Sequence, residues 1–363
     1  MQLKNKPILL ISPEAWGKSY VSKHHYALEL AKKGNEVYFL NPPSSSFRIK
    51  QLEFGVNIID YRPIFRGLGK IPSFISSYLT RIELLNIEKK IGKQFKVIWN
   101  FDSSRFFDLK KLRKGVLKIG HIVDLSENLQ RHRLSKSMDI GFCTTDFIQK
   151  EMLPYNSKVF KVHHGYRPPE KFETLPIIKD EKVKVGYVGN LSIKYLDWDI
   201  IYKIAKENSE LNFYFIGPVG KSNISNTNKL DPFLLKTQSL KNTFFLGAKP
   251  SKEIPAYLEL FDILLLAYRV QQYREQLASP HKVMEYLGAG KTILASYTDE
   301  YKDKSHLLEM VENNAELPLH FQEVVSQLND YNSKEKKDIR IAFAMANTYG
   351  EQIKRIENLI ASL

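Results

Sequence analysis

The strongest constraint on the fold is a regular alternation of short apolar runs with amphipathic segments. Residues 7–12 form a strand-like apolar run, an amphipathic helix pattern then ends at Gly34, and a second apolar run over 36–43 is closed by prolines. The alternation continues along the chain and restarts at residue 183. Strands that alternate with helices pair in parallel, so the sequence predicts an α/β protein with two doubly wound, Rossmann-like sheets.

The predicted domain boundary lies in a segment rich in proline and charge. We predict an N-terminal domain over residues 1–168, a linker over 169–182 and a C-terminal domain over 183–335. The last segment, 336–363, has apolar residues at helical spacing, and its helices pack back on the N-terminal domain or cap either domain. Two such domains joined by one linker predict a cleft between facing strand ends, which suits a transfer between two substrates.

The excess of positive charge lies entirely in the N-terminal half of the chain. Residues 1–170 contain 29 Lys and Arg against 15 Asp and Glu, whereas the remainder contains 25 of each. This asymmetry predicts that one half faces an anionic surface or ligand. No apolar run approaches the roughly 20 residues that cross a bilayer. We therefore expect a cytoplasmic protein, with peripheral attachment to the inner membrane face left open.

The composition also limits the kinds of site that the chain can hold. Cys143 is the only cysteine, so an internal disulfide and a cysteine metal cluster are excluded. The sequence contains no recognised nucleic-acid module or dense arginine stripe, and we expect no nucleic-acid partner.

The stretch Gly-Ala-Gly-Lys-Thr at 288–292 looks like the end of a phosphate-binding P-loop, but its spacing excludes one. The motif places its first glycine five residues before Gly290, where this chain has Glu285, and it requires a helix after the lysine. Residues 292–297 are apolar and end in small residues, which predicts a strand. The helix therefore precedes the glycines, and Gly288 and Gly290 are predicted to stop it.

That helix is predicted to begin at Pro280, with Ser279 as its N-cap. The free amides of His281 and Lys282 then favour an anion, and the Lys282 ammonium adds a full charge. Glu285 projects from nearly the same face one turn deeper, where its carboxylate can accept hydrogen bonds from ribose hydroxyls. The pattern fits a nucleoside diphosphate, and it also fits an ordinary capped helix with a surface Lys–Glu pair.

The segment SPHKVMEYLGAGKTILAS, residues 279–296, resembles the signature [NS]-P-x-K-x-x-E-Y-x-A-x-G-K-P-[IV]-[IV]-[AS] of nucleotide-sugar glycosyltransferases of the GT-B fold, retaining family four and its relatives. The likeness is dense over about residues 183–297 and looser over 1–165. Within that class the chain is most similar to the cell-wall and capsule polysaccharide transferases of the teichuronic-acid type. The resemblance implies a GT-B fold and a hexosyl-type glycosyltransferase.

Matched residue by residue, the resemblance implies that Ser279, Pro280 and Lys282 lie at the donor diphosphate and that Glu285 binds the ribose hydroxyls. The backbone implied at the base is that of Leu246, Gly247 and Ala248. The family's Gly-Arg-Leu beside the phosphates is replaced by Gly189, Asn190 and Leu191, so its arginine is absent. The cations that are candidates to supply the missing charge are Lys194, Arg269 and Arg274, the arginines because guanidinium binds phosphate bidentately.

A second departure concerns the sugar. Eight positions before Glu285, where the family often has a glutamate that contacts the sugar, this chain has Leu277, and Glu275 stands two residues away. The two departures keep open a non-catalytic scaffold or binding protein of the same fold, and a nucleotide-sugar epimerase is a third reading. Lys282 and Glu285 favour the transferase.

In the N-terminal half, His121 and Asp124 follow a predicted strand at the end that faces the cleft. Either could orient the sugar or take the proton of the acceptor hydroxyl, and a structural role is the alternative. Lys18 and Ser19, in the loop after the first strand, either reach a phosphate or belong to a plain loop.

Residues 61–96 interleave basic side chains with Phe65, Phe74, Ile75 and Tyr78. Such a segment suits an anionic membrane face, and a solvated basic helix covering the sheet explains it equally well. Taken together, we predict transfer of a sugar from a nucleotide-diphosphate sugar, with UDP as the working nucleotide, to a glycan or lipid-linked acceptor in surface polysaccharide synthesis. The nucleotide sugar is a co-substrate, and no metal or other cofactor is expected.

Overall fold

The computed structural model describes residues 2–17, 20–52, 55–125, 130–170, 181–220 and 230–362. The chain divides into two compact units, each treated by itself below. Unit 1 comprises Met1–Gly165 and Tyr349–Leu363, and unit 2 comprises Tyr166–Thr348. Lys18, Ser19 and most of the predicted linker lie outside the described residues, so these two assignments stay predictions.

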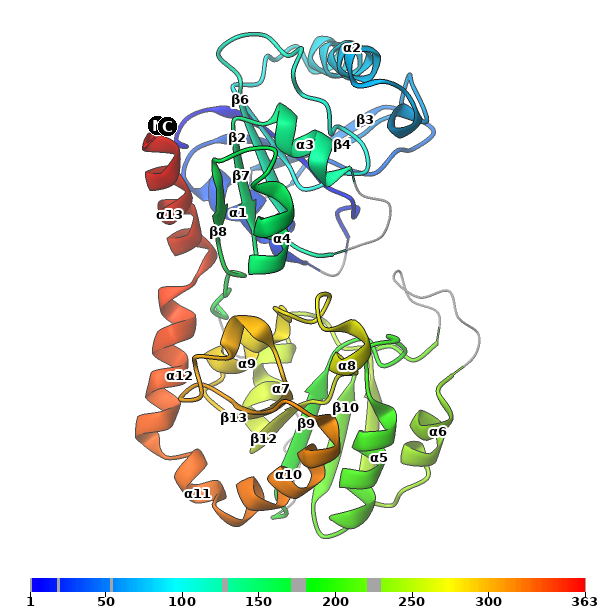
Figure 1. The fold of residues 1–363 in the computed structure, drawn as a ribbon, viewed down its shortest axis with the longest axis vertical. Coiled ribbons are helices and arrows are strands. Elements are labelled where there is room, and N and C mark those ends of the chain that lie inside the picture. The colour runs from blue at the N-terminus through cyan, green and yellow to red at the C-terminus, as the bar shows by residue number, and fades with distance from the viewer. Residues whose placement is uncertain are drawn as a thin grey trace. The chain divides into compact units, whose positions relative to one another are not determined.

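Unit 1 is built on a sheet whose strand order is β3-β4-β2-β1-β5-β6-β7-β8 (Figure 1). Neighbouring strands pair in parallel, except that β3 is antiparallel to β4. The strands are β1 (Pro7–Ile11), β2 (Glu36–Leu40), β3 (Arg48–Gln51), β4 (Val56–Asp60), β5 (Val97–Asn100), β6 (Leu117–Ile122), β7 (Ile140–Cys143) and β8 (Val159–Lys161).

Helices cover both faces of this sheet. One apolar cluster joins side chains of α1 (Ser22–Lys32) and α13 (Tyr349–Ala361) to the sheet, and a second joins those of α2 (Ser73–Ile91), α3 (Arg131–Ser137) and α4 (Asp146–Met152). A 3₁₀ turn, η1 (Leu68–Lys70), precedes α2. The two clusters make unit 1 a three-layer α/β structure, as the alternating pattern predicts.

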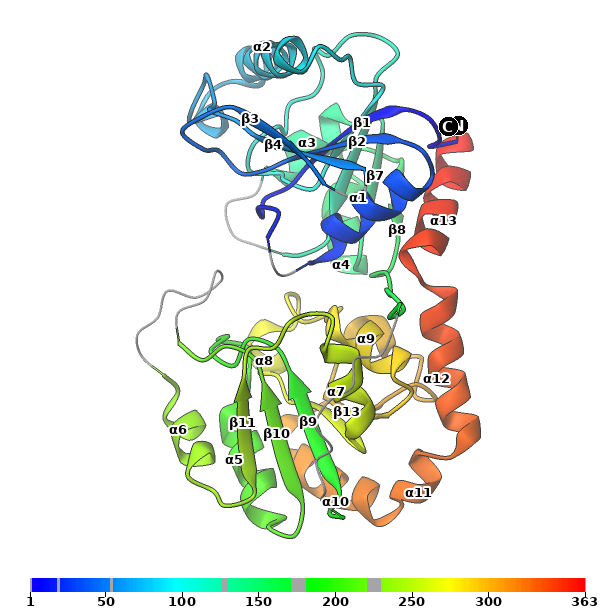
Figure 2. The same ribbon diagram turned by 180° about the vertical axis from the view of Figure 1, so that it is seen from behind.

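Unit 2 repeats the architecture on a parallel sheet of order β11-β10-β9-β12-β13-β14 (Figure 2). Its strands are β9 (Lys184–Val188), β10 (Asn212–Ile216), β11 (Thr243–Gly247), β12 (Ile263–Leu266), β13 (Thr292–Ser296) and β14 (Glu309–Val311). Its helices are α5 (Trp198–Glu207), α6 (Pro232–Gln238), α7 (Ile254–Leu260), α8 (Val270–Tyr273), α9 (Lys282–Gly288), α10 (Leu317–Ser326), α11 (Leu328–Tyr331) and α12 (Lys334–Ala346), with 3₁₀ turns η2 (Asp299–Tyr301) and η3 (Asn314–Glu316).

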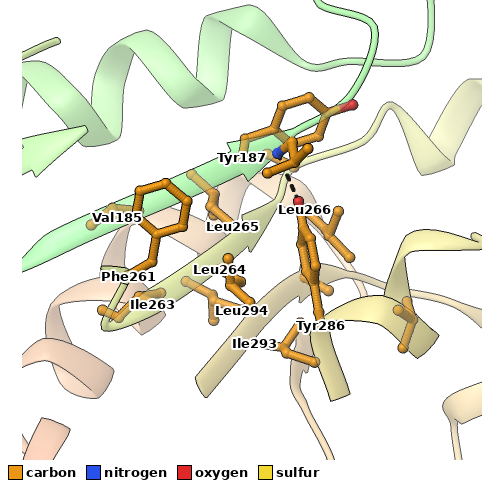
Figure 3. Close-up of a cluster of buried hydrophobic side chains, with 14 of the residues drawn as sticks. Val185, Tyr187, Phe261, Ile263, Leu264, Leu265, Leu266, Tyr286, Ile293 and Leu294 are labelled. Carbon is orange, nitrogen blue, oxygen red and sulfur yellow. Dashed lines mark hydrogen bonds between the residues drawn. The ribbon is translucent and has the colours of Figure 1, made fainter. Parts of the chain in front are cut away.

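The core of unit 2 lies between its sheet and these helices. Figure 3 shows Val185 of β9, Leu264 of β12 and Leu294 of β13 together with Phe261 from the end of α7, and all four are buried. The chain runs from β9 through β10 to β11 and then returns to β12 on the other side of β9. Strand order therefore reverses between β9 and β12, the place where open parallel sheets bind ligands beyond the carboxyl ends of the strands.

The two C-terminal helices belong to different units. The helical spacing of residues 336–363 left open on which unit each helix packs. α12 ends in unit 2, where the backbone amide of Tyr166 donates to the Asn347 carbonyl over 2.8 Å, and α13 packs on α1 in unit 1. Arg340 of α12 is buried and donates to the carbonyls of Gly290 and Leu307. Unit 2 therefore continues past the predicted boundary at residue 335, because α12 packs on the turn that follows α9.

Gly290 offers a test of this packing, because it adopts a left-handed conformation, with φ of 69°. A Cβ there would lie 2.6 Å from Cγ of Lys337 and 3.0 Å from Cδ1 of Ile341, both on α12. Gly290→Ala should therefore combine backbone strain of roughly 1–2 kcal/mol with a further cost of about 1 kcal/mol for displacing α12. Urea unfolding and calorimetry would measure the combined loss of stability.

The matched control is Gly220→Ala, since Gly220 is also left-handed, with φ of 86°, and a Cβ there would meet nothing within 4 Å. Equal losses of stability for the two variants would contradict the packing argument.

Candidate functional site

Three neighbouring strands of unit 2 each have a glycine at their carboxyl end, which is the edge where sheets of this kind bind ligands. Gly189 follows β9, Gly217 follows β10, and Gly247 ends β11. The Gly189 amide donates to the Ile216 carbonyl over 2.8 Å, and the Gly217 amide donates to the Gly247 carbonyl over 2.9 Å. A Cβ on Gly217 would overlap the carbonyl oxygen of Gly189. The ends of β9 and β10 can therefore approach one another only because Gly217 carries no side chain.

Lys282, the first residue of α9, lies against this glycine backbone. A Cβ on Gly189 would lie 2.6 Å from Nζ of Lys282 and 2.7 Å from the hydroxyl of Tyr187. The ammonium also stands 6.0 Å from the centroid of the Tyr187 ring. Burial lowers the pKa of Lys282, and the nearby Glu285 carboxylate opposes that shift. The fold thus brings a cation to the end of β9, where the strand order reverses.

Glu285 supplies a hydrogen-bond acceptor one turn along the same helix. Its side chain is 41% exposed, and Nδ1 of His281 lies 3.9 Å from its Oε1. Burial raises the pKa of the Glu285 carboxyl, whereas Lys282 lowers it. A cation and a carboxylate on one helical face can together bind a ligand that carries both negative charge and hydroxyl groups.

Tyr286 fixes α9 to the sheet. Its side chain is fully buried, and its hydroxyl accepts a hydrogen bond of 2.9 Å from the backbone amide of Val188, the last residue of β9 (Figure 3). This bond holds the helix that carries Lys282 and Glu285 at a set height above the strand. The helical spacing of Lys282 and Glu285 gives Tyr286 no role, although the tyrosine stands directly after the glutamate in the family signature.

The predicted start of this helix is wrong by two residues. α9 begins at Lys282 with His281 in the cap position, so Ser279 and Pro280 lie in the preceding turn. The amide of Val283 donates to the Pro280 carbonyl over 3.1 Å, an i to i+3 bond. A tighter 3₁₀-type turn therefore leads into the helix at the point where a regular α-helical turn was expected.

The predicted stop is confirmed at Gly290, whose amide donates to the Leu287 carbonyl over 2.9 Å. Gly288 is instead the last helical residue, and a Cβ there would meet the ring of Tyr166. The ammonium of Lys291 donates to the Glu259 carbonyl over 2.7 Å, and the Thr292 hydroxyl donates to the Asn332 side chain over 2.8 Å. The lysine and threonine of the apparent P-loop therefore make contacts within the protein, as expected for a stretch that is not a P-loop.

The cations considered as replacements for the missing arginine have protein partners. Arg269 forms an ion pair of 2.7 Å with Asp231, and Arg274 forms one of 3.0 Å with Asp299. The Lys194 ammonium lies 5.1 Å from the centroid of the Tyr273 ring and 5.4 Å from that of Tyr195. A phosphate-binding role for these three residues stays a prediction, and for the arginines it requires exchange of a carboxylate for the phosphate.

Asn190, Leu246 and Gly247 lie at the same edge of the sheet. The Asn190 side chain accepts a hydrogen bond of 2.9 Å from the Ser192 amide and so shapes the turn after β9. Leu246 is half-buried and Gly247 is exposed with φ of 70°, both at the end of β11. Glu275 lies in an exposed turn after α8.

In unit 1, the structure separates the two candidate catalytic residues. His121 of β6 is 1% exposed, and its ring lies 4.8 Å from Phe101 and 5.3 Å from Tyr26 between centroids. Burial lowers the pKa of His121 to about 3, with His164 and Lys23 contributing, so the imidazole is neutral at physiological pH. Asp124 is exposed just beyond β6. This placement favours the structural alternative for His121 and leaves Asp124 accessible.

Within the described ranges, no three His, Cys, Asp or Glu side chains are grouped so that they could hold a metal ion. None of the described helices combines the length and the apolar character needed to cross a bilayer.

The chain is similar in sequence to a curated protein. No protein-family model matches the sequence. The chain is 26% identical over 224 residues to the putative teichuronic acid biosynthesis glycosyltransferase TuaH of Bacillus subtilis (strain 168), a match that covers 56% of this chain and 52% of TuaH. The chain therefore spans about half the length of that relative.

Solved structures show the fold. Sucrose-phosphate synthase of Thermosynechococcus elongatus superposes with a TM-score of 0.71 at 12% identity, covering 98% of each chain. Anabaena HepE, in a complex with UDP-glucose, superposes with a TM-score of 0.68 at 11% identity, covering 99% of this chain and 100% of HepE. This chain has the two-sheet α/β architecture of the GT-B glycosyltransferases, so the predicted fold class is confirmed.

The bond between Tyr286 and Val188 predicts a measurable loss of stability. Tyr286→Phe removes the acceptor and leaves the buried Val188 amide unpaired, which should lower the free energy of unfolding by about 1–3 kcal/mol. Tyr257→Phe is the matched control, because Tyr257 is buried on α7 and its hydroxyl has no hydrogen bond among the described residues. If urea unfolding finds no difference between the two variants, the proposed anchor is incorrect.

Proposed function

We propose that this chain is a glycosyltransferase that moves a hexosyl-type sugar from a nucleotide-diphosphate sugar to a glycan or lipid-linked acceptor in surface polysaccharide synthesis. The observation that carries the proposal is the Lys282 ammonium lying against the Gly189 backbone, with the partly exposed Glu285 carboxylate one turn away. The name of TuaH as a putative teichuronic acid biosynthesis glycosyltransferase and the UDP-glucose in the HepE structure support the same class.

Each group in the site has a distinct proposed task. The Lys282 ammonium neutralises the donor diphosphate and stabilises the charge that grows on it as the sugar leaves. The Glu285 carboxylate accepts hydrogen bonds from the ribose hydroxyls, and the backbone at Leu246 and Gly247 contacts the base. Ser279, Pro280 and His281 form the turn that leads into the helix beside the diphosphate. Catalysis then rests on positioning and charge stabilisation, and we propose that it needs no metal.

The acceptor side is assigned to unit 1. Its strongly basic sequence suits an anionic, lipid-linked or growing glycan acceptor at the inner face of the membrane. Asp124 is exposed after β6 and is the residue there that we propose for positioning or deprotonating the acceptor hydroxyl.

A non-catalytic nucleotide-binding protein of the same fold is the second candidate, because of one observation. Leu277, which stands where the family has a glutamate at the sugar, is buried in the core of unit 2 and offers no polar contact. The buried leucine favours loss of turnover with retention of the nucleotide.

The test is an incubation with a panel of nucleotide sugars, with and without a membrane extract and with and without EDTA, following release of nucleoside diphosphate. Release that depends on the extract and withstands EDTA supports the transferase. Tight nucleotide binding with no turnover on any acceptor supports the non-catalytic protein. Formation of an isomeric sugar without any acceptor would indicate an epimerase.

Two substitutions should separate the roles within the site. Lys282→Gln removes the charge at the diphosphate, and Glu285→Gln removes the charged acceptor at the ribose, so each should weaken UDP binding by about tenfold or more, equivalent to roughly 1.4 kcal/mol. Lys203→Gln on the exposed face of α5 is the charge-matched control. Calorimetric titration of UDP that leaves both site variants at wild-type affinity would remove the basis of the proposal.

The lowered pKa of Lys282 predicts a pH dependence. The ammonium is charged below its pKa, so UDP affinity should fall as pH rises through a value below the ordinary 10.5. Lys282→Arg should hold its affinity to higher pH, because guanidinium stays protonated. Titration of the nucleotide itself is common to both proteins, so the difference between the two affinity profiles, from neutral pH to about pH 10, isolates Lys282. Identical profiles would contradict the prediction.

A further inference from the structure

Helix α2 of unit 1 has the reverse of the usual polarity of a surface helix. Its buried residues are mostly polar: Ser76, Ser77, Thr80, Glu83 and Glu88, with Leu84 and Ile87. Its exposed residues include large apolar ones: Phe74 at 71% exposure, Tyr78 at 57%, Leu85 at 45% and Ile75 at 39%. A surface helix normally turns its apolar stripe to the core, so this arrangement needs an explanation.

Specific bonds hold the polar face inward. Glu83 accepts a hydrogen bond of 2.8 Å from the amide of Ile64. Glu88 accepts one of 2.8 Å from the amide of Phe95 and forms a bidentate pair with Arg113 at 2.7 Å. Rotating the helix to bury its apolar side would break these bonds and leave two carboxylates without their partners. The apolar face is therefore held outward by the fold.

The exposed apolar side chains alternate with cations along one stripe. Phe74, Tyr78, Arg81, Leu85 and Lys89 recur at spacings of three and four residues, so they share one helical face. Ile64, in the segment before the helix, is 49% exposed and adds to the apolar surface.

The charge on this surface has a single sign. Residues 61–96 contain eight Lys and Arg and two acidic residues, Glu83 and Glu88. All eight basic side chains are exposed, and both carboxylates are buried. The segment thus presents apolar groups and positive charge to the outside and keeps its negative charge inside.

We propose that the exposed face of α2, together with the segment 62–70 before it, is the surface by which this protein docks on an anionic lipid bilayer. Apolar side chains in the acyl boundary with cations at the headgroups are the binding mode of an interfacial helix. Protein interfaces are depleted in lysine, whereas Lys89 here shares one stripe with Phe74, Tyr78 and Leu85, and Lys90 is exposed beside it. The inference deepens the proposed function by placing the lipid-linked acceptor and the enzyme at the same surface.

The experiment is co-sedimentation of the full chain with vesicles of phosphatidylcholine alone or of phosphatidylcholine with phosphatidylglycerol. The protein should bind the anionic vesicles, with an affinity that falls as salt rises, and should bind the neutral ones at least tenfold more weakly. Phe74→Ser with Tyr78→Ser removes the apolar component, and Arg81→Glu with Lys89→Glu reverses the charge. Each pair should weaken binding to anionic vesicles by at least tenfold.

The matched control variants make the same kinds of substitution at exposed positions of unit 2. Leu319→Ser changes an apolar side chain of unit 2 that is 64% exposed, and Lys203→Glu with Lys302→Glu reverses two exposed charges there. Both controls should bind vesicles as the wild type does. Equal losses of vesicle binding in the controls, or undiminished binding by the α2 variants, would overturn the proposal. Displacement of the protein from vesicles by polyuridylate, added at the same phosphate concentration as the lipid, would also overturn it.

The measurement is independent of the proposed activity. Vesicle binding is recorded without a sugar donor, and UDP binding is recorded for the same variants in solution. Wild-type UDP affinity shows that unit 2 of the α2 variants is folded, and a wild-type urea unfolding transition shows the same for unit 1. Vesicle binding that fails while UDP binding holds rejects the docking surface alone, and the reverse rejects the nucleotide site alone.

Discussion

Gly189 and Gly217 lie against one another at the carboxyl ends of β9 and β10, and neither position has room for a side chain. Everything else in the candidate donor site depends on this contact. Because Gly189 has no Cβ, the Lys282 side chain can lie on the backbone at the end of β9. Because Tyr286 accepts the Val188 amide, α9 is held where Lys282 reaches it. Because the strand ends approach so closely, the carboxyl edge of this sheet forms a surface that can bind a phosphate.

Unit 1 shows the same dependence of surface chemistry on buried polar bonds. Glu83 and Glu88 accept hydrogen bonds inside the unit, so α2 keeps Phe74 and Tyr78 outward, and the exposed charges of residues 61–96 are all positive. The fold therefore determines on which surface the excess of 14 positive charges in the sequence lies. The two units divide the proposed reaction accordingly, with the nucleotide on unit 2 and the anionic partner on unit 1.

Much of the fold was predictable because its strands are buried on both faces and its helices lie on the sheets. Apolar runs such as residues 7–12 and 292–297 predict β1 and β13 correctly. The short strand β3 has no buried residues, so its sequence lacks the apolar run that predicts a strand. In the donor site, Lys282 and Glu285 were found through their spacing on one helical face, whereas the start of α9 was missed because a 3₁₀-type turn precedes it.

The sequence by itself determined the spacing of apolar residues, and with it the two largely parallel sheets, the helix that precedes the glycines, and the exclusion of a P-loop. Only the tertiary structure decided which residues meet. It placed His121 among aromatic rings, gave Arg269 and Arg274 carboxylate partners, and assigned α12 and α13 to different units. The physical reason is that helix and strand periods are local properties of the chain. Burial and ion pairing instead depend on residues far apart in sequence, which come together only when the sheets are complete.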